Sequence, residues 1–529
     1  MAIEQKPVTI TFAGGINTRQ RIADIMADEC TDGQNFELSR EQRALIARKP
    51  FDLVATAPNL SQINGYAQLV TRAGAVTTLI QAGTGVYSWD GASAFTLVGT
   101  VSGSAELRGP LEQNFTLDDI VIITDLNKAQ PVMQWNGTTF STFTHNLGGS
   151  LYAKFARVVG ERLLLANVTA ATAVPHLLVG SELSNANVLT VSNRPSSALS
   201  DADPFYLPMP DLKPINGMEE VAQQLVLSTA RGKLFALSGS SAFDFNITPF
   251  YQGSSISNDD AMVNTGNDLL LGVEGRIETL SGIVGFGDVE TNDLTRFIST
   301  EVDEVTGWRM VYDRRNQRVM CFPDDGTVCW VFYKGLLYYG SQKQLNTDTS
   351  SLSPWSKWTT NHVMEMRPTT VMRLIDPASM IEYVYMGDRF GNIYRFDGAG
   401  DRDGALNAVT VKRRSGLIMA PDADIFDVRV NIDYRKNIAA DVVLRFLFAG
   451  VETADATLTV SIPSGGSAFY GGSFYYGGVY YYSSQAGKIR RTQKHAQGRG
   501  NGLQIEVEIS AQGVVDIQQI EIILNAAKG

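Results

Sequence analysis

The chain contains few of the residues from which disulfide scaffolds and zinc sites are built. Among its 529 residues are three cysteines, Cys30, Cys321 and Cys329, and four histidines. So small and odd a number of cysteines excludes a disulfide framework of the secreted kind. The histidines are scattered, and the sequence has neither a His-x-x-x-His nor a Cys-x-x-Cys pair. We therefore expect no zinc and no other bound cofactor.

Long apolar runs and targeting signals are also missing. An apolar run such as 120–123 is far shorter than the roughly 18 residues that cross a bilayer. The first residues show no basic region followed by an apolar stretch, so we expect no signal peptide. These features predict a protein that folds in a reducing cytoplasm and is not integrated in a membrane.

Charge is scarce and its balance is acidic. Charged residues make up 19% of the chain, against about 25% in typical globular proteins, which excludes long disordered charged tails. The 44 basic and 55 acidic side chains give a net charge of −11. Because nucleic-acid binding draws its affinity from cations that neutralise phosphates, this balance argues against a protein that grips DNA.

The motifs of common enzyme classes do not occur. There is no Gly-x-Ser-x-Gly elbow, no phosphate-cradling Gly-x-x-x-x-Gly-Lys loop and no Gly-x-Gly-x-x-Gly. A glycosidase needs only two acids in one cleft, so the acid pairs 118–119, 259–260 and 324–325 leave that chemistry open. Each pair adjoins turn residues, where aspartate caps backbone amides. We expect no catalytic residue and a chain that is not an enzyme.

Glycine is abundant, with 49 residues spread between short apolar or alternating runs. Runs such as 77–83, 234–237 and 318–322 have the length of strands and end at turn residues. Helical periodicity is scarce, with short candidates at Glu41 to Arg48 and Gly217 to Leu227. The pattern predicts an all-β chain.

Two hairpin signatures refine the fold class. Trp89-Asp90-Gly91 and Trp135-Asn136-Gly137 each read as a strand end followed by a tight turn, because Asp/Asn-Gly supplies positive φ angles. The tryptophans lie 46 residues apart, about the length of one four-stranded propeller blade. We predict a β-propeller over residues 51–400. The proline-rich stretch 144–215 is interpreted as an insertion on its surface.

The two ends of the chain differ from this middle. Long strands that carry charge on one face recur at 426–434, 442–448, 503–509 and 517–524, and predict a C-terminal β-sandwich-like domain over 401–529. Residues 1–50 are expected to form an N-terminal arm with short helices.

Two local features leave alternatives open. If Pro323 opposes Thr327 across the turn 324–326, Cys321 lies opposite Cys329, either as a cross-strand disulfide or as two reduced core residues. The stretch 397–404 resembles part of a calcium loop but lacks a closing glutamate, and a linker between domains is the other interpretation.

An aromatic ribbon at 469–482 is the most unusual segment. Tyrosine buries a large area and keeps a polar tip, so we expect an intermolecular contact here, with buried strands of the terminal domain as the alternative. Five basic residues follow within 488–499 and are expected to be solvated or paired, although single-strand binding is open. The predicted interface residues of the ribbon are Phe469, Tyr470, Phe474, Tyr475, Tyr476, Tyr480, Tyr481 and Tyr482.

The opening segment carries a family resemblance. Phe12-Ala13-Gly14-Gly15-Ile16-Asn17-Thr18-Arg19-Gln20 leads through the acidic stretch 22–32 to Asn35-Phe36. This resembles the opening of the tail nozzle or head-completion (packaged-DNA stabilisation) proteins of short-tailed bacteriophages, in which such a stretch precedes a propeller. The Trp-Asp/Asn-Gly hairpins and the strand-rich end are similar too, whereas the aromatic ribbon is not a feature of the group.

The resemblance implies a structural protein of the virion tail, assembled in the host cytoplasm. It would form a homo-oligomeric ring, a hexamer, below the portal and adaptor, with tail fibres or a needle as further partners and the genomic DNA passing without specific binding. Gly14, Gly15, Asn17 and Arg19 would then belong to an arm that docks on a neighbour or on the adaptor. A carbohydrate- or receptor-binding propeller at the virion tip is the alternative function, and a propeller hydrolase the third.

Overall fold

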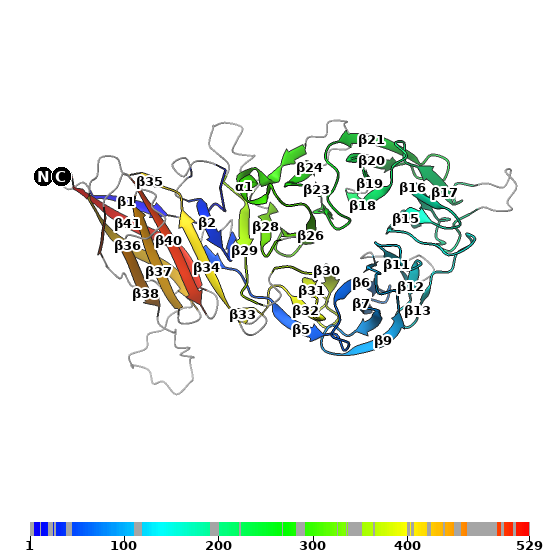
Figure 1. Cartoon of the computed structure of the whole chain (residues 1–529), viewed down its shortest axis with the longest axis horizontal. Helices are drawn as coiled ribbons and strands as arrows, with labels where there is room; N and C mark the ends of the chain where they lie inside the picture. The colour runs from blue at the N-terminus through cyan, green and yellow to red at the C-terminus, as the bar shows by residue number, and fades with distance from the viewer. Residues whose placement is uncertain are drawn as a thin grey trace.

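The structure is a computed structural model of the 529-residue chain. Two lobes lie side by side, a ring of sheets and a smaller pair of sheets (Figure 1). The residues that the structure describes are 5–10, 12–19, 25, 28–38, 45–109, 119–190, 200–221, 224–266, 268–281, 291–324, 326–334, 336, 352–362, 366–398, 402–403, 407–419, 425–436, 440–448, 456–462, 495–498, 502–511 and 515–527.

The larger lobe is a β-propeller of seven four-stranded blades, all antiparallel within a blade. Blade 1 consists of β6 (Ile63–Val70), β7 (Val76–Ala82), β8 (Gly85–Trp89) and β9 (Phe95–Thr100). Blade 2 consists of β10 (Leu107–Arg108), β11 (Val121–Asp125), β12 (Met133–Trp135) and β13 (Phe140–Thr142). Blade 3 consists of β14 (Phe155–Val159), β15 (Arg162–Thr169), β16 (Ala173–Gly180) and β17 (Phe205–Pro208).

The remaining four blades complete the circle. Blade 4 consists of β18 (Ile215–Val221), β19 (Gln224–Thr229), β20 (Lys233–Ser238) and β21 (Asn246–Gln252). Blade 5 consists of β22 (Met262–Asn264), β23 (Asp268–Val273), β24 (Arg276–Ser281) and β25 (Thr291–Asp293). Blade 6 consists of β26 (Trp308–Asp313), β27 (Arg318–Pro323), β28 (Cys329–Tyr333) and β29 (Trp355–Trp358). Blade 7 consists of β30 (Thr370–Ile375), β31 (Glu382–Gly387), β32 (Asn392–Arg395) and β5 (Asp52–Thr56).

The ring closes through a strand from the other end of the propeller sequence. The outer strand of blade 7 is β5, which pairs with β32 although more than 300 residues separate them. The innermost strands of neighbouring blades contact one another around the axis, including β30 with β6. Pairing the first strand with the last blade joins the two ends of the ring by backbone hydrogen bonds.

The tryptophan hairpins predicted from sequence occupy equivalent places. Trp89 ends β8 and Trp135 ends β12, each the third strand of its blade. Gly91 and Gly137 have φ values of 85° and 93°, as their turns require. The propeller prediction is confirmed, and the distance of 46 residues is one blade repeat.

Three local predictions were wrong. The proline-rich stretch 144–215 is not an insertion, because β14–β17 within it form blade 3. Pro208 lies in the outermost strand, where a missing N–H leaves no ladder bond unmade. The segment Gly217 to Leu227, predicted as a helix, lies in the β18–β19 hairpin. In the segment Glu41 to Arg48, also predicted as a helix, the described residues include the strand β4 (Leu45–Ala47). The described helical residues include α1 (Ser299–Val302) and the short turn Leu294–Phe297.

The smaller lobe is the predicted C-terminal β-sandwich, built from two antiparallel sheets (Figure 1). One sheet has the order β3 (Phe36–Leu38), β4, β41 (Val515–Ala527), β36 (Ile425–Lys436) and β39 (His495–Gly498), with β1 (Gln5–Ile10) also on β41. The other has the order β2 (Cys30–Gln34), β34 (Asn407–Ser415), β40 (Gly502–Ala511), β37 (Ala440–Phe448) and β38 (Ala456–Ile462), with β33 (Arg402–Asp403) also on β34 and β35 (Ile418–Met419) also on β40. The N-terminal residues thus supply four strands to this lobe.

The N-terminal segment before β2 lies between the two lobes. The Gly15 N–H donates to the Ser353 carbonyl (2.6 Å) and the Ile16 N–H to the Trp355 carbonyl (2.8 Å), both on or beside β29 of blade 6. A Cβ on Gly15 would lie 2.0 Å from the Trp355 carbonyl oxygen. Only glycine permits this approach, so the segment is an internal seam rather than a free arm.

Two buried arginines stack on the faces of Trp358 at the junction of the lobes. The guanidinium of Arg48 lies 5.7 Å from the Trp358 ring and that of Arg318 lies 4.7 Å from it. Arg48 pairs with Asp403 and also donates to the Asn35 side-chain oxygen (2.9 Å). Its partners come from β33 and from the turn between β2 and β3, so this arginine joins distant segments.

Arg318 has three carboxylate partners. Asp313 lies at 2.9 Å, Glu37 at 3.0 Å and Asp397 at 2.6 Å. Burial works to lower the pKa of the guanidinium, but these three carboxylates raise it well above its usual value. Glu37 is in the sandwich and the other two acids are in the propeller. One continuous apolar core passes through the same junction and contains residues of both lobes.

The register between the two cysteine strands differs from the prediction by one residue. Cys321 pairs with Trp330, so Cys329 points to the opposite face of the blade. Both thiols are buried and free, as is Cys30. Burial raises the pKa of Cys30 to about 11 and that of Cys321 well above its usual value.

The seam at Gly15 yields a stability prediction. Gly15→Ala should lower the free energy of unfolding by about 3 kcal/mol, because the new methyl group meets a backbone oxygen that cannot move aside. Urea unfolding followed by tryptophan fluorescence measures it. Gly148→Ala is the control, since no atom lies within 4 Å of its Cβ position, and it should change stability by less than about 0.5 kcal/mol. Equal stability of the two variants would contradict the seam.

The cysteines yield a chemical prediction. At neutral pH the folded protein should not react with iodoacetamide, because all three thiols are buried and raised pKa values keep them protonated. After unfolding without reductant, mass spectrometry should find three alkyl groups. Finding only one would reveal a disulfide and contradict the register.

Candidate functional site

The seven innermost strands surround a polar cavity on the propeller axis. Its volume is about 430 Å³. Five cations and four carboxylates line it, together with Tyr66, Tyr312 and apolar side chains. The charged residues are Arg108, Lys154, Arg157, Arg314, Arg373, Glu219, Glu220, Asp259 and Asp260.

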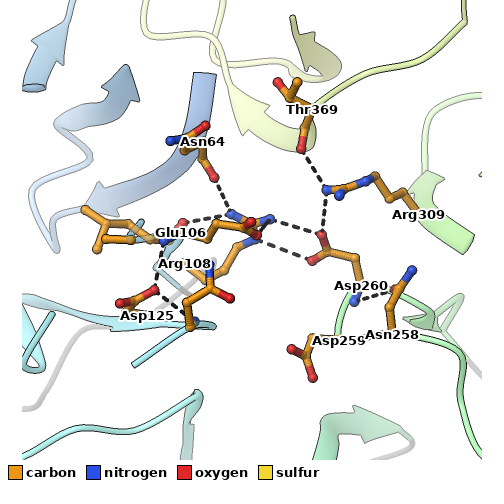
Figure 2. A network of polar contacts seen from close by, with 12 residues as sticks. Asn64, Glu106, Arg108, Asp125, Asn258, Asp259, Asp260, Arg309 and Thr369 are labelled. Atoms are coloured by element: carbon orange, nitrogen blue, oxygen red, sulfur yellow. Dashed lines mark hydrogen bonds and ion pairs between the residues drawn. The ribbon is translucent and has the colours of Figure 1, made fainter. Parts of the chain in front are cut away.

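An ion pair spans the axis at the end where the innermost strands begin. Arg108 is on β10 of blade 2, and Asp260 precedes β22 of blade 5, on the other side of the ring. The Arg108 guanidinium approaches both carboxylate oxygens, at 3.0 and 3.4 Å, and donates to the Asn64 carbonyl at 2.9 Å. Figure 2 shows Arg108 and Arg309 converging on the Asp260 carboxylate from two sides. We call Asn64, Arg108, Asp260 and Arg309 the axial network.

Arg309 of blade 6 completes the axial network. Its guanidinium lies 3.4 Å from Asp260, 3.2 Å from Asp324 and 2.7 Å from the Thr369 carbonyl, to which it donates. Burial alone would raise the pKa of Asp260, but the guanidiniums of Arg108 and Arg309 bring it below its usual value. Asp260 is therefore a charged structural anchor that joins blades 2, 5 and 6.

The neighbouring carboxylate has a different partner. Asp259 pairs with Lys154 (2.9 Å), and burial raises the pKa of Asp259. The sequence left open an acid pair at 259–260, but the two carboxylates diverge to separate cations. A substrate would have to displace these cations before both acids could act on one bond.

A second cavity opens on the same end of the propeller, between blades 6, 7 and 1. Its volume is about 340 Å³. We call it the face cavity. Arg309, Asn64 and Thr369 of the axial surroundings belong to its wall, so the two sites adjoin. Its lining residues are Gln62, Asn64, Glu106, Arg309, Phe322, Pro323, Asp324, Arg367, Pro368, Thr369, Asp388 and Arg389.

The interface residues predicted in the opening segment are mostly internal. Gly14, Gly15 and Asn17 are buried, and only Arg19 is exposed. The Asn17 side-chain amide donates to Glu29 (3.1 Å), whose other oxygen accepts from the Ser353 N–H. The prediction that these glycines and Asn17 dock on a neighbouring subunit is wrong, because they pack within their own chain.

Other predicted sites are either occupied by arginines or undescribed. Asp397 and Asp403 of the calcium-like stretch pair with Arg318 and Arg48, so their carboxylates are engaged. In the described part of the chain no cluster of three metal-ligating side chains occurs. The aromatic ribbon at 469–482 and most of the basic stretch 488–499 lie outside the described residues.

No local sequence pattern predicts the axial network. Arg108, Asp260 and Arg309 belong to three blades and are up to 201 residues apart. Only the closed ring brings them together. All three residues lie near the innermost strand of their blade. This shared position could be recognised from sequence only if the boundaries of the blades were already known.

Comparisons with known proteins give no family for the chain. No protein-family model matches it, and no curated protein matches its sequence. It is similar to the solved WD40 domain of Neurospora crassa Pan2, with 12% identity and a TM-score of 0.41 over 66% of this chain and 95% of that one. It is also similar to YCF48 from Cyanidioschyzon merolae (9%, 0.38, 66% and 98%) and to virginiamycin B lyase from Staphylococcus aureus (9%, 0.39, 65% and 98%).

Among the helices of the described ranges, none has the length and apolar character needed to span a bilayer.

The axial network yields a pH-dependent prediction. Asp260→Asn should lower the free energy of unfolding at pH 7 by about 2 kcal/mol, because Arg108 loses its charged partner. The depressed pKa of Asp260 means that the pair stabilises the fold above about pH 4 and that this contribution disappears as the pH falls through the folded-state pKa. The difference from the parent protein should therefore shrink in acid.

Urea unfolding at several pH values measures this difference. The control is Glu304→Gln, which removes an exposed carboxylate without an ion pair in the described structure and should leave stability unchanged. A penalty for Asp260→Asn that stays constant from pH 7 to acid would contradict an ionic role.

Proposed function

We propose that the chain is a structural subunit of a short phage tail, and that copies of it form the distal ring, or nozzle, through which the packaged genome leaves. The proposal takes its class from the resemblance of the opening segment and its mechanism from the shape of the molecule. The chain acts in it as a building block and not as an enzyme.

The observation that carries the proposal is the buried junction between the two lobes. A continuous core, the Gly15 seam and the Arg48 and Arg318 clusters fix the propeller to the sandwich. Head-to-tail contacts between identical subunits generate a closed ring only if the rotation from one subunit to the next closes, which requires that the two contact surfaces of each subunit keep a constant relative orientation. A rigid two-lobed subunit therefore suits a ring, whereas loosely joined lobes would allow rings with different numbers of subunits.

The closed propeller axis supports the same proposal. The Arg108–Asp260 pair spans the axis, so DNA does not pass through a single propeller. A conduit would have to run between copies, along the axis of the ring. The net charge of −11, repeated around that ring, repels a polyanion weakly and provides a wall that does not retain it.

Electron microscopy of the purified full-length protein tests the proposal. We expect closed rings with a central opening, and labelling of intact virions with an antibody should place the protein at the tip of the tail. An electrophoretic shift assay with duplex DNA at low salt should show no complex. Monomers at every concentration, together with no label on the tail, would overturn the proposal.

The alternative, a carbohydrate-binding propeller at the virion tip, is favoured by one observation, the face cavity with its amides, acids and arginines. A glycan array separates the two functions. Binding of a defined glycan by a protein that does not form rings would support the alternative.

A further inference from the structure

We propose that the face cavity and its apolar edge bind an acidic segment of another protein, in which carboxylates alternate with aliphatic side chains. This inference does not depend on the proposed function, because a propeller can bind such a segment whether or not it assembles into a ring.

Two arginines on the cavity wall are available to a ligand. Arg367 and Arg389 are exposed, and neither forms an ion pair with a carboxylate of the described residues. Arg309 in the same wall differs, since Asp260 and Asp324 hold it. A guanidinium offers a planar pair of donors that matches a carboxylate, so the free arginines mark where acids would bind.

An apolar edge adjoins the cavity. Phe390 follows Arg389, whose guanidinium stacks on its ring at 4.8 Å, and 41% of Phe390 is exposed. Gly391 packs against the backbone of Leu60, which is 68% exposed. Leu60 also has a φ of 52°, an unfavourable conformation for a residue other than glycine. An exposed leucine that is held in a strained turn beside an exposed phenylalanine is typical of a binding surface.

The composition of the site favours a peptide over a nucleic acid or an acidic sugar. Glu106, Asp324 and Asp388 lie in the same wall and would repel a continuous phosphate backbone, whereas a peptide can place its carboxylates at Arg367 and Arg389 alone. Leu60 offers an aliphatic surface that suits an aliphatic side chain of a peptide. An extended peptide with spaced carboxylates and an aliphatic side chain would pair its acids with Arg367 and Arg389 and pack its aliphatic side chain on the apolar edge.

Selection from a displayed library of random twelve-residue peptides tests the proposal on the full-length protein. We expect the enriched peptides to contain two or more acids and an aliphatic residue. Fluorescence anisotropy of a labelled enriched peptide should show at least fivefold weaker binding to Arg367→Ala and to Arg389→Ala, and more than twentyfold weaker binding to the double variant. Phe390→Ser should weaken it as well.

The matched control is Arg231→Ala. Arg231 is an exposed arginine in the corresponding turn of blade 4, between its second and third strands, and is far from the face cavity. The Arg231→Ala variant should bind the peptide with the affinity of the parent protein. Thermal unfolding should show that all variants fold. Enriched peptides without acids, or equal binding by the double variant, would overturn the proposal.

Two further probes decide the class of ligand. An oligogalacturonate and a single-stranded oligonucleotide are titrated into the same proteins. Arginine-dependent binding of either one, without enrichment of any acidic peptide, would overturn the peptide assignment. Because anisotropy with excess protein does not require assembly, failure here leaves the ring proposal untouched, and absence of rings leaves this one untouched.

Discussion

The stacking of two buried guanidiniums on Trp358 is the constraint on which the two-lobed architecture depends. Neither Arg48 nor Arg318 can be buried without its carboxylates, because an unpaired buried charge is strongly destabilising. Those carboxylates come from the sandwich and from the propeller. Neither lobe alone supplies all of them, so the charges are satisfied only when both lobes have folded against each other.

The same logic of shared charges operates on the propeller axis. Asp260 has cationic partners from blades 2 and 6, and Asp259 pairs with Lys154 at the start of blade 3. The order of the blades follows from the chain, but backbone pairing within each blade does not determine which side chains meet across the axis. The ion pairs between particular blades stabilise the closed ring, because incomplete closure would leave a buried charge without its partner.

The sequence predicts the features that repeat locally and misses those that depend on the closed fold. Trp89 and Trp135 identify two blades because each precedes an Asp/Asn-Gly turn, and the positive φ angles of such a turn are a local requirement that sequence alone reveals. Blade 3 is missed because prolines mask its strands, although one of them, Pro208, lies in an outermost strand where proline is tolerated. The docking arm at Gly14-Gly15 follows from the family resemblance, whereas the close approach of Gly15 to the Trp355 carbonyl within its own chain depends on the folded structure and has no local sequence signal.

Net charge is a poor guide to where arginines act in this molecule. Arg413 is buried and donates to the carbonyls of Gly14 (2.7 Å) and Asp28 (2.5 Å), and burial lowers its pKa. Arg48 and Arg318 neutralise acids inside the junction. Such buried arginines count in the net charge of −11 but are not accessible to a partner in solution. What a partner meets is decided by the arginines that remain exposed and unpaired, so an acidic chain can carry a local site for acids, as at Arg367 and Arg389.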